Sequence, residues 1–205
     1  KSLASKLLGL LGRDQDLPTI LGGGDHSADA PPLLLQLCSR LDSSTAELAL
    51  MATNSLLIAM EGREEEPLGP PLLRGGLVAC TPWQSWTDSR LGSDGRPSRL
   101  PDAWHGGRVD WELPRYYLPE VNGHWIRALR GLKARAQGIS RPWTAGLEEA
   151  LTRMESEFRE KRWDGTFLAS IVDSVTGEAD RQVTSMGMVG LATTQHLFSG
   201  DELRR

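Results

Sequence analysis

Hydrophobic and polar positions along this chain recur with periods that predict helices for much of its length. The clearest amphipathic helix is expected over Thr144–Trp163, where apolar side chains recur every three or four residues and charges occupy the other face. Another is expected over Leu118–Gln137, followed by a glycine that favours its end. The side chains predicted to face inward are Leu147, Leu151, Met154 and Phe158 in the first helix and Val121, Trp125, Leu129 and Leu132 in the second.

The N-terminal segment 1–12 predicts a short amphipathic helix, with leucines at helical spacing and Gly12 favouring its end. A helix this short is not stable alone. We therefore expect it to dock on the chain's own core or on a partner, and a membrane surface is a weaker alternative because two lysines make a weak anchor. The docking contacts predicted are Leu3, Leu7, Leu10 and Leu11.

Two more helices are expected between residues 31 and 62. Two consecutive prolines favour the start of the first helix. Ser43, Ser44 or Thr45 can cap the second, and Glu47 lies three residues after Ser44, as in a capping box. The second helix is apolar over much of its surface, so we expect it to lie centrally. One face of the first helix carries Leu33, Leu34, Leu37 and Leu41.

Short strands are predicted between and after these helices. Gly76–Thr81 is typical of a buried strand, and Arg108–Leu113 alternates as a strand does. Thr166–Val172 and Gln182–Val189 predict a late hairpin. Together these elements predict an α+β fold, mainly helical in its N-terminal and central segments, with a small antiparallel sheet. The alternative is a mostly α-helical protein with irregular loops.

Length and composition agree with one domain over residues 1–205. Within it, residues 61–75 form an acidic, proline-broken stretch that we expect to be an exposed loop. An apolar share of 39% and a charged share of 24% exclude a collagenous, mucin-like or fully disordered chain. No apolar run approaches the roughly 20 residues of a membrane-spanning helix.

The net charge of -4 conceals a basic centre between two acidic flanks. Residues 74–138 carry 10 basic and 6 acidic side chains, whereas the segment before has 5 and 10 and the segment after has 8 and 11. Basic side chains interleaved with aromatic ones can track a nucleic-acid backbone. The simpler interpretation is that the charges pair with the acidic flanks and the tryptophans fill the core. The nucleic-acid candidates on the outer face of the helix at 118–137 are Arg127, Arg130, Lys133 and Arg135.

Tryptophan and arginine also carry much of the energy of protein interfaces. Five of the seven tryptophans lie in the basic centre, and three of them, Trp83, Trp86 and Trp104, are our interface candidates there. A neighbouring segment, WHGGRVDWE, places His105 near Asp110 and Glu112. Two carboxylates on one strand face beside a histidine could hold a metal or perform acid–base chemistry. The simpler interpretation is that they are solvated charges that protect an edge strand, because the sequence supplies no further partner for them.

The segment Leu21–Ser27, LGGGDHS, resembles the LGGDHS motif of the ureohydrolase family, the arginases and agmatinases. In that family the segment follows a strand and its histidine binds a two-manganese centre, so the resemblance implies that His26 is a metal ligand. The family's Asp-Ala-His-x-Asp segment and later Asp-x-Asp segment have no counterpart in this chain. Because one histidine cannot assemble a two-metal centre, we interpret the glycines as a turn.

No nucleophile elbow, zinc-protease motif or phosphate-binding loop occurs in the chain, so we assign no catalytic residue, no metal and no cofactor. Cys38 and Cys80 are expected to be small buried apolar side chains. The opening segment lacks the small-residue cleavage site of a signal peptide. Without a cysteine framework, we expect an intracellular, cytoplasmic location or a place within a virion, not a disulfide-rich secreted protein.

The leading hypothesis is a non-enzymatic structural or assembly protein, such as a virion or matrix-like subunit. It would act through contacts with other protein subunits, including self-association. One alternative is a metal-dependent hydrolase that uses His26, or His105 with Asp110 and Glu112. The other is a nucleic-acid-binding module that uses the basic, tryptophan-rich middle of the chain.

Overall fold

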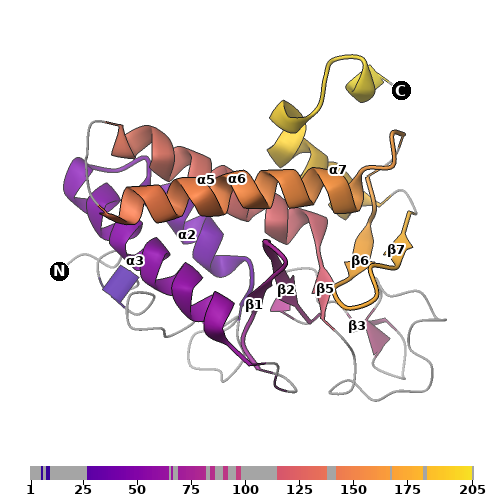
Figure 1. The fold of residues 1–205 in the computed structure, drawn as a ribbon, viewed down its shortest axis with the longest axis horizontal. Coiled ribbons are helices and arrows are strands. Elements are labelled where there is room, and N and C mark those ends of the chain that lie inside the picture. The colour runs from indigo at the N-terminus through magenta and orange to yellow at the C-terminus, as the bar shows by residue number, and fades with distance from the viewer. Residues whose placement is uncertain are drawn as a thin grey trace.

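The computed structural model of the chain describes residues 6, 8–9, 27–64, 66, 69–81, 84–85, 90–91, 96–97, 115–137, 142–166, 168–181 and 184–204. Helices form most of this part of the chain (Figure 1). Their bounds are α2 Ala30–Cys38, α3 Ser43–Gly62, α5 Pro119–Ala136, α6 Pro142–Arg162 and α7 Ser185–Thr194, followed by the 3-10 turns η3 Gln195–Leu197 and η4 Glu202–Arg204.

A five-stranded antiparallel sheet in the order β1-β2-β5-β6-β7 lies beside the helices, and β3 and β4 form a separate antiparallel pair. The late hairpin is β6 and β7, with Ile171 opposite Asp180. The predicted α+β fold with a small antiparallel sheet is therefore confirmed. The strands are β1 Leu72–Arg74, β2 Leu77–Cys80, β3 Arg90–Leu91, β4 Arg96–Pro97, β5 Tyr116–Tyr117, β6 Ile171–Asp173 and β7 Ala179–Asp180.

Helix α5 is the central helix, because α2, α3, α6, α7 and strand β2 all pack against it. Its predicted inward row of Val121, Trp125, Leu129 and Leu132 is buried. The indole Nε1–H of Trp125 donates a hydrogen bond to the carbonyl of Ala28 at 3.1 Å, which ties α5 to the residues just before α2. The predicted inward row of α6 is buried as well.

Helix α7 crosses α5 where both backbones carry glycine. A Cβ atom on Gly190 would lie 2.7 Å from Cβ of Pro119, and a Cβ on Gly123 would collide with the side chain of Thr193. Helix α7 begins at Ser185, so the strand predicted at Gln182–Val189 is wrong over its described part. Thr184 caps this helix, its side chain accepting a hydrogen bond from the N–H of Gly187 at 3.1 Å.

The side chain of Asn122 hydrogen-bonds to strand β2 beyond the end of its neighbour β5. Strand β5 ends at Tyr117, opposite Ala79, and the chain then turns into α5. One turn later, buried Asn122 takes the place of a strand partner for Val78. Its Oδ1 accepts from the Val78 N–H at 2.8 Å, and its Nδ2 donates to the Val78 carbonyl and to the Leu118 carbonyl, both at 3.0 Å. This side chain fixes α5 against β2.

The last residue of α6 is a fully buried arginine, Arg162. Its Nη1 donates to the carbonyl of Ala169 at 2.9 Å, and its Nη2 donates to the carbonyl of Tyr117 on β5. The guanidinium carbon lies 5.5 Å from the centre of the Phe158 ring. Arg162 therefore joins the end of α6 to two segments of the sheet region.

Several local predictions need correction. The cap of α3 is Asp42, whose Oδ1 accepts from the Thr45 N–H at 3.0 Å, so neither Ser43, Ser44 nor Thr45 starts the helix as its cap. The predicted loop at 61–75 is shorter, because α3 continues to Gly62 and β1 begins at Leu72. The strand expected from Thr166 begins only at Ile171, and Leu168 forms an isolated bridge with Trp163.

Three residues of the N-terminal segment are described, and all three are helical. One of them, Leu8, is buried in the hydrophobic core, so this segment contacts the chain's own core there. Cys38 and Cys80 are buried, as predicted, and they form no disulfide with each other. None of the helices in the described ranges combines the length and the hydropathy that crossing a membrane requires.

Candidate functional site

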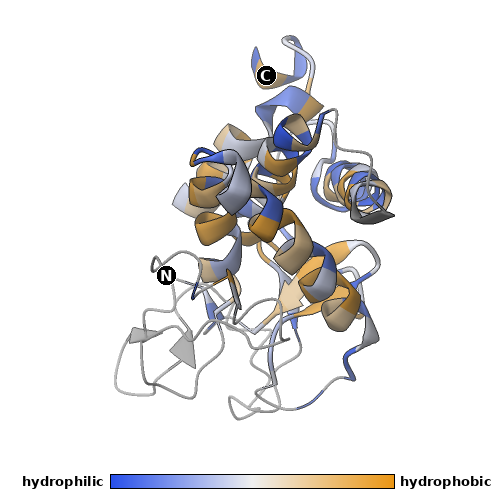
Figure 2. Cartoon of the chain, turned by 90° about the vertical axis from the view of Figure 1, so that its left-hand side faces the viewer, coloured by the Kyte–Doolittle hydropathy of each residue, from blue (hydrophilic) through white to orange (hydrophobic). Residues whose placement is uncertain are grey.

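The outer faces of α2 and α3 carry large apolar side chains that the core does not cover. On α2 the inward row is Pro31, Pro32, Leu35 and Cys38. Of the four leucines predicted to share one face, Leu34 packs partly buried against the core and the other three are exposed, with Leu37 56% exposed. The exposed members are Leu33, Leu37 and Leu41. Figure 2 shows apolar and polar residues mixed over the helices of this side.

Helix α3 presents a longer exposed row, which corrects the expectation of a central position. This α3 row consists of Ser44, Leu48, Met51, Ser55, Ile58 and Gly62, all of them exposed. Leu48 is 44%, Met51 48% and Ile58 64% exposed. The six positions follow a 4-3-4-3-4 spacing, which is the spacing of a coiled-coil seam. None of the six is charged, so water meets an uncharged stripe along the whole helix.

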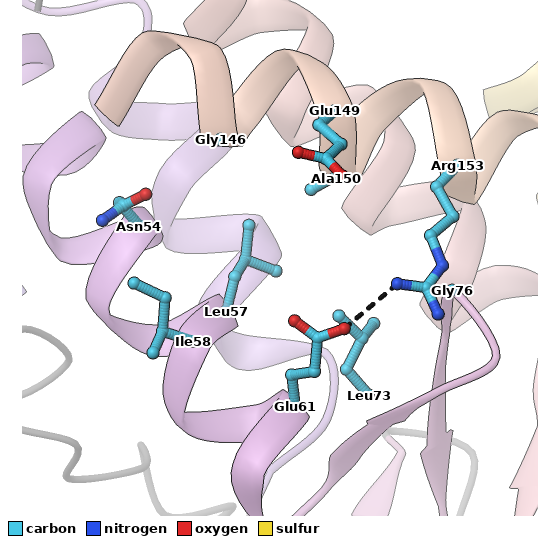
Figure 3. Close-up of a pocket in the computed structure, with 10 residues that line it drawn as sticks. All are labelled: Asn54, Leu57, Ile58, Glu61, Leu73, Gly76, Gly146, Glu149, Ala150 and Arg153. Atoms are coloured by element: carbon cyan, nitrogen blue, oxygen red, sulfur yellow. Dashed lines mark hydrogen bonds and ion pairs between the residues drawn. The ribbon is translucent and has the colours of Figure 1, made fainter. Parts of the chain in front are cut away.

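A small cavity opens beside this α3 row, between α3, α6 and the β1–β2 turn (Figure 3). Its volume is about 170 Å³. Ile58 belongs both to the α3 row and to the lining of the cavity. The apolar lining residues are Leu57, Ile58, Leu73 and Ala150, and the polar ones are Asn54, Glu61, Glu149 and Arg153.

An ion pair bridges the cavity at the end near the β1–β2 turn. Arg153 Nη1 on α6 lies 3.0 Å from Glu61 Oε1 on α3, and Figure 3 shows this pair beside Gly76. Gly76 has a φ of 82° and lies against the Arg153 side chain, since a Cβ there would come 2.8 Å from Cγ of Arg153. A glycine is needed at this position for both reasons.

Acidic side chains flank the α3 row on the side that faces α6. Glu47, Asn54 and Glu61 are spaced seven residues apart and therefore form one stripe next to the row. Glu149 lies across the cavity on α6. Glu61 and Glu149 line the cavity together with one cation, Arg153, which is already paired with Glu61. The α6 side of the row is therefore negatively charged.

The four basic nucleic-acid candidates lie on the outer part of α5, as predicted, and three of them contact other parts of the chain. Arg130 pairs with Glu155 at 2.9 Å, and Lys133 lies 3.6 Å from Glu148. Arg135 donates to the carbonyl of Leu41, and Arg127 is exposed. Exposed ion pairs of this kind are weak, so these side chains could exchange their partners for phosphate groups. Nucleic-acid binding stays a prediction.

Most of the other predicted site residues lie outside the described residues. These are Leu3, Leu7, Leu10, Leu11, Trp83, Trp86, Trp104, His26, His105, Asp110 and Glu112. The last residue of the LGGGDHS segment is described: Ser27 Oγ accepts from the Ala30 N–H at 2.9 Å and donates to Asp29 at 2.7 Å. It therefore helps to start α2. Within the described ranges, no group of three His, Cys, Asp or Glu side chains could hold a metal.

Half-buried His124 on α5 lies where α2 packs against that helix. Gln36 Nε2 donates to the backbone carbonyl of His124 at 3.1 Å and lies 3.3 Å from its Nδ1. Burial lowers the pKa of His124. Asp29 and Glu120 oppose this shift, and Arg127 adds to it. The neutral imidazole is therefore favoured in the folded chain.

This shift predicts a loss of stability in acid. Below a pH of about 6.5, the unfolded chain binds a proton that folded His124 resists, so the free energy of unfolding should fall with pH from that point. The variant His124→Gln cannot take up this proton and should lose less stability than the wild type between about pH 7.5 and pH 5.5. Urea unfolding at both pH values measures the difference, and equal losses in the two proteins would contradict the prediction.

No protein-family model matches this chain, and no curated protein matches it either. Function must therefore be inferred from the site itself. The α3 row was missed at the level of sequence, although its 4-3-4-3-4 spacing is visible there. The opposite side of α3 is equally apolar, with Leu50, Leu56 and Leu57. The pattern alone therefore indicated a helix buried on every side.

Proposed function

We propose that this chain is a non-enzymatic structural or assembly protein that acts through protein–protein contacts made by the outer faces of α2 and α3. The observation that carries the proposal is the uncharged α3 row, in which Leu48, Met51 and Ile58 remain exposed. Contiguous exposed apolar surface commonly marks an interaction site in a folded protein. Leu33 and Leu37 on α2, and Leu41 between α2 and α3, are exposed as well.

Self-association, or a place in a virion or another intracellular assembly, fits this proposal. Both cysteines of the chain are buried and outside any disulfide, which suits a reducing compartment. The hydrolase alternative depends on His26, or on His105 with two carboxylates, and these stay predictions.

The proposal is tested by the size of the protein in an extract of the cells that naturally make it, detected with an antibody after size-exclusion chromatography. We expect it to elute well above the mass that the same polypeptide shows on a denaturing gel. The double variant Leu48→Glu, Met51→Glu should elute as a single chain, because two carboxylates desolvated in an interface are strongly unfavourable.

A matched control places the same two charges on an outer face of α6. Thr152→Glu, Ser156→Glu changes two exposed residues four positions apart and should leave the elution unchanged. Circular dichroism confirms that both double variants are folded. A wild-type protein that elutes as a single chain, and that remains uncrosslinked after treatment of intact cells with a crosslinker, would refute the proposed function.

A further inference from the structure

We infer that the α3 row and the adjoining cavity receive one basic amphipathic helix of a partner protein. This inference rests on the proposed function and adds the chemistry of the partner. Three features of the face specify it: the spacing of the row, the cavity beside Ile58 and the acidic stripe toward α6.

The spacing of the row selects a helix as the occupant. Exposed positions at 4-3-4-3-4 intervals form a nearly straight line along α3, and a second helix matches such a line with its own side chains at the same intervals. An amphipathic helix that lies in an apolar groove uses anchors spaced in this way. A strand would place its side chains with a period of two and would match only part of the row.

The cavity is large enough to bind one large apolar side chain of that helix. Its volume of about 170 Å³ is comparable with the roughly 150 Å³ that holds a benzene molecule in a protein interior. The apolar walls come from α3, α6 and β1, with Ile58 at the border with the row. Because buried anchors in pockets carry much of the binding energy of interfaces, the side chain in this cavity should dominate affinity.

The charges around the row select a basic partner and disfavour a second copy of α3. Glu61 and Glu149 line the cavity, with Arg153 as the one cation among its lining residues. Glu47 lies on the same stripe of α3 as Glu61, two heptads earlier. If two copies of α3 paired antiparallel about the middle of the row, Glu47 of each would lie opposite Glu61 of the other, and like charges repel. Lysines or arginines on one flank of a partner helix would meet these carboxylates favourably.

The experiment uses the full chain and two synthetic helical peptides. Both peptides carry leucines at three- and four-residue intervals. One has lysines on one flank and the other has glutamates at the same places. Isothermal titration calorimetry should give a micromolar dissociation constant for the basic peptide and at least tenfold weaker binding for the acidic one. Added salt should weaken the basic peptide's binding.

Variants locate the binding face. Ile58→Asp should weaken binding of the basic peptide by at least tenfold, and Ala150→Met, which fills the cavity, should weaken it several-fold. Glu47→Lys should shift the preference toward the acidic peptide. The uncharged control pair Thr152→Gln, Ser156→Gln, on an outer face of α6, should bind like the wild type.

Two outcomes would refute the basic-helix inference. Failure of both peptides to bind, or equal binding of the two, refutes the basic-helix inference. Dimerisation of the purified chain that Met51→Glu abolishes would make a second copy the occupant, which also refutes the inference. Neither result removes the proposed function, because the extract experiment decides that separately.

Discussion

Replacement of Asn122 by leucine is expected to lower the free energy of unfolding by about 3 kcal/mol. The leucine matches the shape of the side chain, yet it leaves the N–H and the carbonyl of buried Val78 without their partner. Each buried backbone group left unpaired costs about 1–3 kcal/mol. For a chain of this size, about 3 kcal/mol corresponds to a fall in Tm of about 6–12 °C. Thermal and urea unfolding measure both quantities.

The variant Asn122→Asp separates lost hydrogen bonds from lost shape. A carboxylate can still accept from the Val78 N–H, but its second oxygen would face the Val78 carbonyl where Asn122 now donates. The protonated acid can donate there, so folding should raise the pKa of this aspartate above its ordinary value of about 3.9. Its stability should therefore decline, relative to the wild type, as pH rises above about 4. A loss of stability that is independent of pH would contradict this account of the side chain.

Helices α5 and α6 could be predicted from sequence within one or two residues at each end. Each has a single apolar row at helical spacing with charges opposite, so the pattern permits one orientation only. In α2 and α3 apolar residues occur on two sides. Leu35 faces the core while Leu37 faces solvent, and nothing in their chemistry distinguishes them. The choice between the two rows depends on which surface the neighbouring helices cover.

Helix α7 could not be recognised because its contacts use small residues. Gly187 and Gly190 are buried, whereas Met188 is exposed, so the hydropathy of this segment does not follow the helical period. The close approach to Pro119 that requires Gly190 is a property of the packed pair of helices. Cap chemistry was also ambiguous, since Asp42 directly precedes the run of hydroxyl residues that was expected to cap α3.

Buried polar side chains were the largest omission. Asn122 and Arg162 are fully buried, although a polar residue on a helix ordinarily predicts an exposed position. Both are held by hydrogen bonds to backbone groups in or beside the sheet, and those groups are brought together only once β5 has paired with β2 and β6. A two-residue strand such as β5 is too short to show a hydrophobic pattern. The burial of the polar side chains that bond beside it could therefore not be predicted either.

Replacement of Arg162 by methionine is expected to lower the free energy of unfolding by about 3 kcal/mol, comparable with the loss at Asn122. Methionine keeps the apolar stem against Phe158 but removes the donors to the carbonyls of Tyr117 and Ala169. Hydrogen bonds that involve a charged group contribute about 1.5–3 kcal/mol each, and part of this is offset because the guanidinium no longer needs to be desolvated. Urea unfolding of the variant and the wild type measures the difference.

A matched control lies one residue earlier on the same helix. Lys161 pairs with Glu157 at 3.1 Å across one helical turn at the surface, and Lys161→Met should change the free energy of unfolding by less than about 1 kcal/mol. The conservative variant Arg162→Lys keeps the charge but lacks the planar fork that reaches two carbonyls at once, so it should be intermediate. If Arg162→Met and Lys161→Met are equally stable, the buried guanidinium contributes no more than a surface charge. In that case the bonds to Tyr117 and Ala169 do not fix the end of α6 against the sheet.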